Sequence, residues 1–218
     1  MQDPNGQPKP QQASVAKRPA AASLERFSAQ DRAAWRAWLA ANHATRPGVW
    51  LVNYKKGSGK PSVTEVEAID EALCFGWIDS MMHPVDAERY EVLFSPRKPK
   101  STWSQRNKLR VAHLTLDGLM TEAGLACVAA AKANGSWNAL DAVEQLQAPP
   151  DLVDALAADT AAHAYFDGLT ASAKKGIIWW VLSAKRPETR SRRIAETVRL
   201  AAQGVTAPLP ANQRAAKG

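Results

Sequence analysis

The residues best suited to bind a ligand are cations that gather in two separate stretches of the chain. Residues 97–110 contain six bases and no acid, and residues 174–199 contain eight bases and two acids. Charge of one sign, concentrated in this way, creates a local field that attracts anions. The alternative is that each stretch is a solvated helix face, since Arg192, Glu196 and Arg199 have the spacing of an ion-pair network on one helix. Both interpretations stay open for each stretch.

In the second stretch, the sequence KRPETRSRRI places two cations directly before Pro187. Proline suits the first position of a helix, so these cations are expected beside a helix N-terminus, where free backbone N–H groups already favour anions. Two further arginines, three residues apart, are spaced to share a face of that helix. Against this, Glu188 in the first turn can satisfy the helix dipole itself. The predicted anion contacts here are Lys185, Arg186, Arg190 and Arg193.

In the first stretch, FSPRKPKSTWS, two prolines hold the chain extended while basic side chains project from it and a tryptophan follows. Cations beside an aromatic ring are one way to grip a nucleotide or a single nucleic-acid strand. They are also how an ordinary loop covers a core. The predicted ligand contacts here are Arg97, Lys98, Lys100 and Trp103.

A third candidate segment is WIDS, in which Trp77 and Asp79 stand two residues apart. A lone carboxylate in such a position is either a hydrogen-bonded structural acid or a site residue. On an enzyme it would act as a general acid or base while the arginines clamp an anionic metabolite. We include Trp77 and Asp79 in the predicted ligand-binding set.

Familiar catalytic and metal-binding motifs fail when they are compared with the chain. The segment GSGK at 57–60 is not a phosphate loop, because Tyr54 stands where that motif needs its first glycine and Pro61 replaces the magnesium-binding hydroxyl. The four histidines show no ligand spacing, and Cys74 and Cys127 lie far apart and are expected to be buried. We therefore predict no catalytic residue, no metal site and no cofactor.

The elements that must position these residues belong to the α+β class. Ser28 is expected to cap a helix over 29–42, and Thr64 one over 64–75. A strand is expected over 49–56, and strands over 77–85 and 89–96 form a hairpin. Helices follow over about 104–117, 121–134, 151–167, 171–185 and 187–203. We predict a small antiparallel sheet of about three strands packed with helices over 24–148, a helical part over 149–204 joined at Pro149-Pro150, and disordered tails over 1–23 and 205–218.

The composition fits a globular protein without a membrane span. The chain has 218 residues, of which 45% are hydrophobic, and this is enough for one sizeable core or two small ones. Its longest strongly apolar run, 177–182, is far shorter than the roughly 20 residues that cross a bilayer. The first 23 residues lack the continuous apolar core of a secretory signal, so we expect a cytoplasmic protein.

Five segments of the chain resemble the YdeI/OmpD-associated family, also called the bacteriocin-protection or OmdA-like family. They occur in the family's order between about Trp38 and Gly204, and they are YKKGSGKPSVT (54–64), EALCFGWIDS (71–80), RYEVLFSPRKPKSTWS (89–104), GLMTEAGLA (118–126) and KRPETRSRRI (185–194). The resemblance implies, for some members, association with a porin and survival of cationic peptides, with no established reaction or cofactor. The lack of a secretory signal argues against porin contact here, and Met81-Met82-His83 stands where relatives often have more polar or basic residues.

Residues and resemblance together predict a non-enzymatic stress or protection protein. Its basic, Trp-lined surface, formed where WIDS, SPRKPKS and KRPETR meet, is expected to bind an anionic ligand or protein partner. Two alternatives stay open. One is a nucleic-acid-binding module, and the other is an enzyme that acts on an anionic metabolite.

Overall fold

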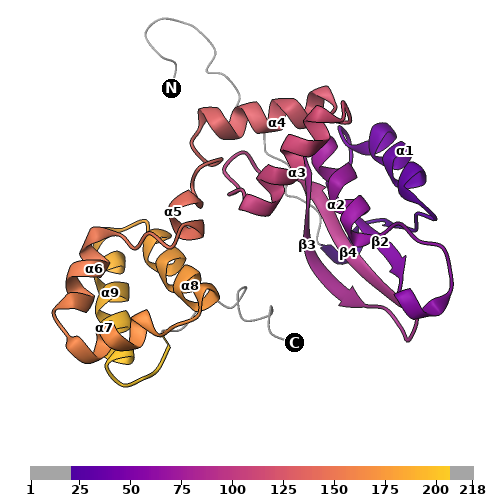
Figure 1. The fold of residues 1–218 in the computed structure, drawn as a ribbon. Helices are drawn as coiled ribbons and strands as arrows, with labels where there is room; N and C mark the ends of the chain where they lie inside the picture. The colour runs from indigo at the N-terminus through magenta and orange to yellow at the C-terminus, as the bar shows by residue number, and fades with distance from the viewer. Residues whose placement is uncertain (1–20, 207–218) are drawn as a thin grey trace, which may run out of the picture. The chain divides into compact units, whose positions relative to one another are not determined.

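The computed structural model describes residues 21–206, which form two compact units that divide between Pro96 and Arg97. The first unit combines a mixed sheet with two α-helices, and the second is helical (Figure 1). The predicted α+β class is confirmed. The joint expected at Pro149-Pro150 falls inside the second unit, where Pro150 begins a helix. The two predicted tails lie almost wholly outside the described residues, although Ala21–Ser23 form a short 3-10 helix, η1.

The sheet has four strands in the order β1-β2-β4-β3. The strands are β1 (Arg26–Phe27), β2 (Val49–Tyr54), β3 (Trp77–Pro84) and β4 (Arg89–Pro96). β4 pairs antiparallel with both β2 and β3, which confirms the predicted hairpin. β1 pairs parallel with β2, so the sheet is mixed rather than purely antiparallel. Two residues are too few to show the alternation that marks a strand in sequence, which is why β1 was missed.

A bulge in β3 decides which of its side chains share a face of the sheet. Residues directly opposite each other in an antiparallel pair point to the same face. Asp79 lies opposite Phe94 and Met82 lies opposite Val92, and the register shifts between Asp79 and Met82. Asn53 shares this face, because it stands two positions along β2 from the partner of Val92. The bulge thus places Asp79 and Met82, although they are three residues apart, on the face that also carries Asn53 and Val92.

The two helices of the first unit begin at side-chain caps. Thr64 caps α2 (Glu65–Cys74) as predicted, and it forms a reciprocal capping box with Glu67. The cap of α1 (Arg32–Asn42) is Asp31, which accepts a hydrogen bond from a backbone N–H of the first turn. The predicted cap, Ser28, instead donates its Oγ–H to a carbonyl of β2. Both residue types can cap, and only the path of the chain selected Asp31.

Aromatic side chains of α1 contact both α2 and the sheet. Trp35 of α1 is fully buried, and its Nε1 donates to the carbonyl of Ala68 in α2 at 3.0 Å. Its ring lies 5.3 Å from the rings of both Trp38 and Phe94. Trp38 in turn meets Trp77 edge to face at 5.9 Å. Such rings bury large areas, and their geometry adds about 0.5–1.5 kcal/mol per pair, so this cluster forms the core of the first unit.

A buried carboxylate makes the second link between the two helices. Glu71 of α2 has a side chain only 1% exposed, and its two oxygens accept from Arg32 Nε and Arg36 Nη1, each at 2.6 Å. The two arginines are one helical turn apart on α1, so one carboxylate meets both. An unpaired buried charge is strongly unfavourable, so Glu71 fixes the position of α2 against α1.

The second unit is built from helices. They are α3 (Gln105–Leu116), α4 (Glu122–Ala133), α5 (Asp141–Glu144), α6 (Pro150–Ala157), α7 (Thr160–Asp167), α8 (Ala171–Leu182) and α9 (Pro187–Ala201). The single helix expected over 151–167 is two helices, because Asp159 leaves the helical conformation and caps α7. Within residues 21–206, no helix is long and apolar enough to cross a membrane.

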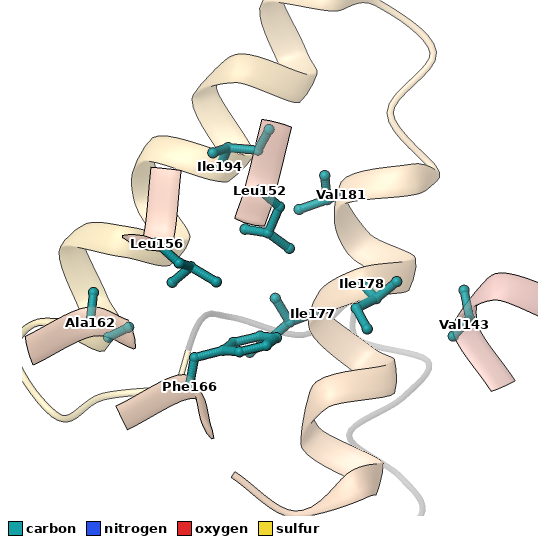
Figure 2. Packing of buried hydrophobic residues seen from close by; sticks show 10 residues of the cluster. Val143, Leu152, Leu156, Ala162, Phe166, Ile177, Ile178, Val181 and Ile194 are labelled. Atoms are coloured by element: carbon teal, nitrogen blue, oxygen red, sulfur yellow. The ribbon is translucent and has the colours of Figure 1, made fainter. Parts of the chain in front are cut away.

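Helices α6, α7, α8 and α9 share one hydrophobic core (Figure 2). Figure 2 shows apolar side chains from these helices converging, and they include Leu152, Leu156, Phe166, Ile177, Val181 and Ile194. Val143 of α5 joins the same cluster. This core holds the turn between α8 and α9, where part of the predicted site lies.

We expect the substitution Glu71→Gln to destabilise the first unit by about 1–3 kcal/mol, because it removes the charge that satisfies two arginines while preserving side-chain size. Urea denaturation followed by tryptophan fluorescence measures the loss. Glu25→Gln is the matched control, since Glu25 and Arg46 form an exposed pair at 3.5 Å that is worth only about 0–1 kcal/mol. Equal losses in the two variants would contradict the role assigned to Glu71.

Candidate functional site

The ten predicted ligand contacts are divided between the two units. Trp77 and Asp79 lie on β3 of the first unit. The other eight, from Arg97 to Arg193, lie in the second. The single concave surface expected from WIDS, SPRKPKS and KRPETR would have to span both units, and it stays a prediction.

The two predicted tryptophans are core residues. Trp77 and Trp103 are each only 1% exposed. The guanidinium of Arg97 lies 3.7 Å from the centre of the Trp103 ring, and its Nη2 donates to the carbonyl of Thr102 at 2.7 Å. Arg97 itself is only 9% exposed. A ligand would reach these rings only if the segments that cover them moved, so their contact with a ligand stays a prediction.

The loop that carries Arg97 is anchored to the turn after α4. The carbonyl of Pro99 accepts from Asn134 Nδ2 at 2.7 Å and from Ser136 Oγ at 3.3 Å. These bonds hold the loop against the second unit, as expected of a segment that covers a core. Lys98 and Lys100 remain exposed, and within residues 21–206 their side chains form no hydrogen bond or ion pair.

Two of the predicted arginines on α9 bind other helices of their own unit. Arg190 donates two hydrogen bonds to the carboxylate of Asp151 on α6, at 2.6 and 2.7 Å. Hydrogen bonding from Arg190 is the main reason that the pKa of Asp151 lies below its ordinary value. Arg193 donates to the carbonyl of Trp180 and to Ser183 Oγ at the end of α8. These contacts dock α9 onto α6 and α8.

The remaining two predicted cations, Lys185 and Arg186, stand exposed between α8 and α9, and we call them the basic corner. Arg186 is the N-cap of α9, and its side chain makes no capping hydrogen bond. In the part of the chain that the structure describes, neither side chain has a hydrogen bond or an ion pair. Backbone N–H groups at such an N-terminus favour anions, as expected from the position of Pro187.

A cavity of about 50 Å³ lies in the first unit between α2 and the face of the sheet that carries Asp79. Its wall contains two carboxylates and an amide, from Glu65, Asp79 and Asn53, and no cation. The other lining residues are Ala68, Ile69, Ser80, Met81, Met82, Val92 and Phe94. Because of its carboxylates, the cavity favours a cationic group. A role for Asp79 in an anion site stays a prediction.

Sequence reasoning missed Asn53 and Glu65 for different reasons. Asn53 looks like one polar residue in a strand, and only the pairing of β2 with β4 places it on the wall of a cavity. Glu65 was assigned to the dipole of the first turn of α2, which it does occupy. The alternation of residues along β2 put Asn53 on the same face as Val49 and Leu51, and this was the available signal.

Cys74 is buried, as expected, whereas Cys127 is only half-buried. Burial, reinforced by the nearby charge of Glu71, raises the pKa of Cys74 to about 11, so its thiol is protonated at neutral pH despite the proximity of Arg36. Burial also raises the pKa of Cys127. In the region from 21 to 206, no group of three or more His, Cys, Asp or Glu side chains has the arrangement of a metal site.

Comparison with known families separates the chain into two matched segments. Residues 145–204 match the family described as Bacteriocin-protection, YdeI or OmpD-Associated. The similarity to this family covers this segment of the chain. The resemblance to this family is thus confirmed over residues 145–204, which contain helices α6 to α9 and the basic corner between α8 and α9. Residues 27–127 match a different family, a domain of unknown function (DUF8412). No curated protein and no solved structure matches the chain.

We expect Cys74 to be almost inert to alkylation in the folded protein. With a pKa of about 11, its thiolate fraction at pH 8 is about 0.1%, against about a quarter for an unfolded cysteine. In a Cys127→Ser background, iodoacetamide labelling followed by mass spectrometry should be about a hundredfold slower or more before than after unfolding in urea. Similar rates in the two states would contradict the buried, protonated thiol.

Arg97→Ala should destabilise the second unit by about 1–3 kcal/mol, since it removes a guanidinium packed on Trp103 and a buried hydrogen bond. Lys98→Ala, next to it and exposed, is expected to change stability by less than about 0.5 kcal/mol. Both are measured by urea denaturation. No loss in Arg97→Ala would contradict the structural role assigned to this guanidinium.

Proposed function

We propose that the protein is a non-enzymatic, cytoplasmic binding protein that holds an anionic partner through the basic corner in the segment that resembles the YdeI/OmpD-associated family. The observation that carries the proposal is the contrast along α9. Arg190 and Arg193 are committed to contacts inside the unit, whereas Lys185 and Arg186 have no partner within the described residues. The two positive charges of the corner are therefore not neutralised by ion pairs within the described residues.

The chemistry of the corner favours an extended polyanion over a small metabolite. An exposed cation contributes only about 0.3–1 kcal/mol to an ion pair or to a charge at a helix terminus, so useful affinity requires many simultaneous contacts. The net charge of +7 adds long-range attraction, and the exposed Lys98, Lys100 and Arg192 supply further cations in the same unit. A nucleic acid is one polyanion of this kind.

A protection role is proposed from the description of the matched family, which names bacteriocin protection. A basic surface repels a cationic peptide, so the basic corner would not capture such a peptide directly. Protection would instead act through an anionic cellular component that the corner binds. This part of the proposal rests on the family description and on the sign of the charge.

The test is a fluorescence anisotropy titration with two labelled polyanions, a mixed-sequence single-stranded oligonucleotide and heparin. Binding through backbone charge must weaken steeply as salt is added. Arg186→Glu should weaken binding by about three- to tenfold and reduce the steepness of the salt dependence by about one ion or more. Binding of heparin without the oligonucleotide would support a polyanion other than nucleic acid.

Lys56→Glu is the matched control, because Lys56 is also exposed and the substitution changes the net charge by the same amount. It lies in η2 (Lys56–Ser58) of the first unit, away from the basic corner in sequence. If Arg186→Glu and Lys56→Glu weaken binding equally, attraction depends on net charge alone and the basic corner has no special role. Absence of binding to both probes would also count against the proposal.

A further inference from the structure

Most carboxylates of the first unit are used to hold the fold together. Glu71 meets two arginines, and other acids are similarly committed. These are Glu67 with Thr64, Asp86 with Arg89, Glu88 with Lys60, and Glu91 with Arg26. Glu65 and Asp79 differ, because within residues 21–206 no hydrogen bond or ion pair reaches either carboxylate. Both line the 50 Å³ cavity between α2 and the sheet.

Asn53 is the third polar residue of this cavity and differs from the two acids in its burial. Its side chain is almost fully enclosed, with 1% of the residue exposed, and it lies on the cavity wall. Its Oδ1 accepts a hydrogen bond from Ser62 Oγ, which itself accepts from the backbone N–H of Tyr54. The Nδ2 group has no acceptor in the described part of the chain. Nδ2 is not among the fully buried atoms that lack a partner in this part of the chain, so it remains accessible from the cavity.

The cavity therefore offers two negatively charged hydrogen-bond acceptors, the carboxylates, beside one hydrogen-bond donor, the amide. A matching ligand has a cationic group and, close to it, a neutral acceptor. The cavity volume allows only a compact group, since one water requires about 10–15 Å³. The free amino terminus of a peptide meets these conditions, because its ammonium and its first carbonyl oxygen lie on adjacent carbon atoms. A lysine side chain does not, because a long methylene chain separates its ammonium from its carbonyl.

We propose that this cavity binds the free amino terminus of a peptide, with Glu65 and Asp79 accepting from the ammonium and Asn53 Nδ2 donating to the first carbonyl. This binding is separate from the polyanion binding proposed for the second unit. Tyr90 lies opposite Asn53 in the sheet, and its pKa is raised by burial and, to a smaller extent, by the negative charge of Glu65. The second cause is consistent with a negative electrostatic field beside the cavity.

The surroundings of the cavity select the side chain of the peptide's first residue. Met81 and Met82 also line the cavity and are 41% and 55% exposed, and flexible thioether side chains adapt to apolar groups of varied shape. An apolar first side chain is therefore expected. A free amino acid is disfavoured, because its own carboxylate would face the two acids of the wall.

The test uses the full chain and the peptide Leu-Val-Gly-Gly with fluorescein at its carboxyl end, followed by anisotropy. Saturable binding is expected, and N-acetylation of the peptide should weaken it by about tenfold or more. In competition, leucinamide should displace the probe about tenfold better than free leucine or 3-methylbutylamine, which lacks the carbonyl. An acetylated peptide with an internal lysine should not compete.

The double variant Glu65→Gln/Asp79→Asn should weaken binding of the free-amine peptide by about tenfold or more. Its matched control is Asp117→Asn/Asp154→Asn, which removes two exposed carboxylates of the second unit and should leave binding unchanged within about twofold. Thermal unfolding of both variants verifies that each is folded.

Several outcomes would overturn the proposal. Equal binding of the free and acetylated peptides, or unchanged binding in the Glu65/Asp79 variant, would show that no ammonium is held there. Equal competition by 3-methylbutylamine would remove the role of Asn53, and equal competition by the lysine peptide would reject the amino terminus as the ligand. None of these results depends on the basic corner, so the polyanion proposal is judged separately.

Discussion

The first unit depends on one buried carboxylate. Glu71 is charged and enclosed, and it is tolerated because Arg32 and Arg36 reach it from the neighbouring helix. Through this contact and the hydrogen bond from Trp35, α2 is held in one position against α1. The cavity exists between α2 and the bulged strand β3, so its shape depends on that position. A packing constraint thus determines the shape of the cavity.

The charged side chains of this protein are of two kinds: some form contacts that stabilise the fold, and others do not. On α9, Arg190 and Arg193 dock the helix onto its neighbours, while the basic corner is exposed. In the first unit, Glu71 is satisfied, while Glu65 and Asp79 are not paired within residues 21–206. Whether a charged side chain is paired depends on partners from distant parts of the chain. Both proposals rest on the charged side chains that have no such partner. Net charge alone would have hidden the acidic cavity.

The local features of the fold could be predicted because they are decided by neighbouring residues. The capping box of Thr64 and Glu67, the hairpin of β3 and β4, and Pro187 at the start of α9 are all indicated by short patterns. Two predictions about helix ends were wrong because short patterns allowed more than one answer. Ser28 and Asp31 are both competent caps, and Asp159 ends one helix and begins another inside a continuous apolar pattern.

The sequence by itself determined the α+β class, most element positions, the two basic stretches and the resemblance that residues 145–204 confirm. Tertiary structure alone decided which charges are engaged, that Trp103 lies in the core, and that Asn53, Glu65 and Asp79 meet on one cavity wall. The physical reason is range. Caps and periodicity act over a few residues, whereas the burial of a ring or the pairing of a charge is settled by strands and helices that are far apart in the chain.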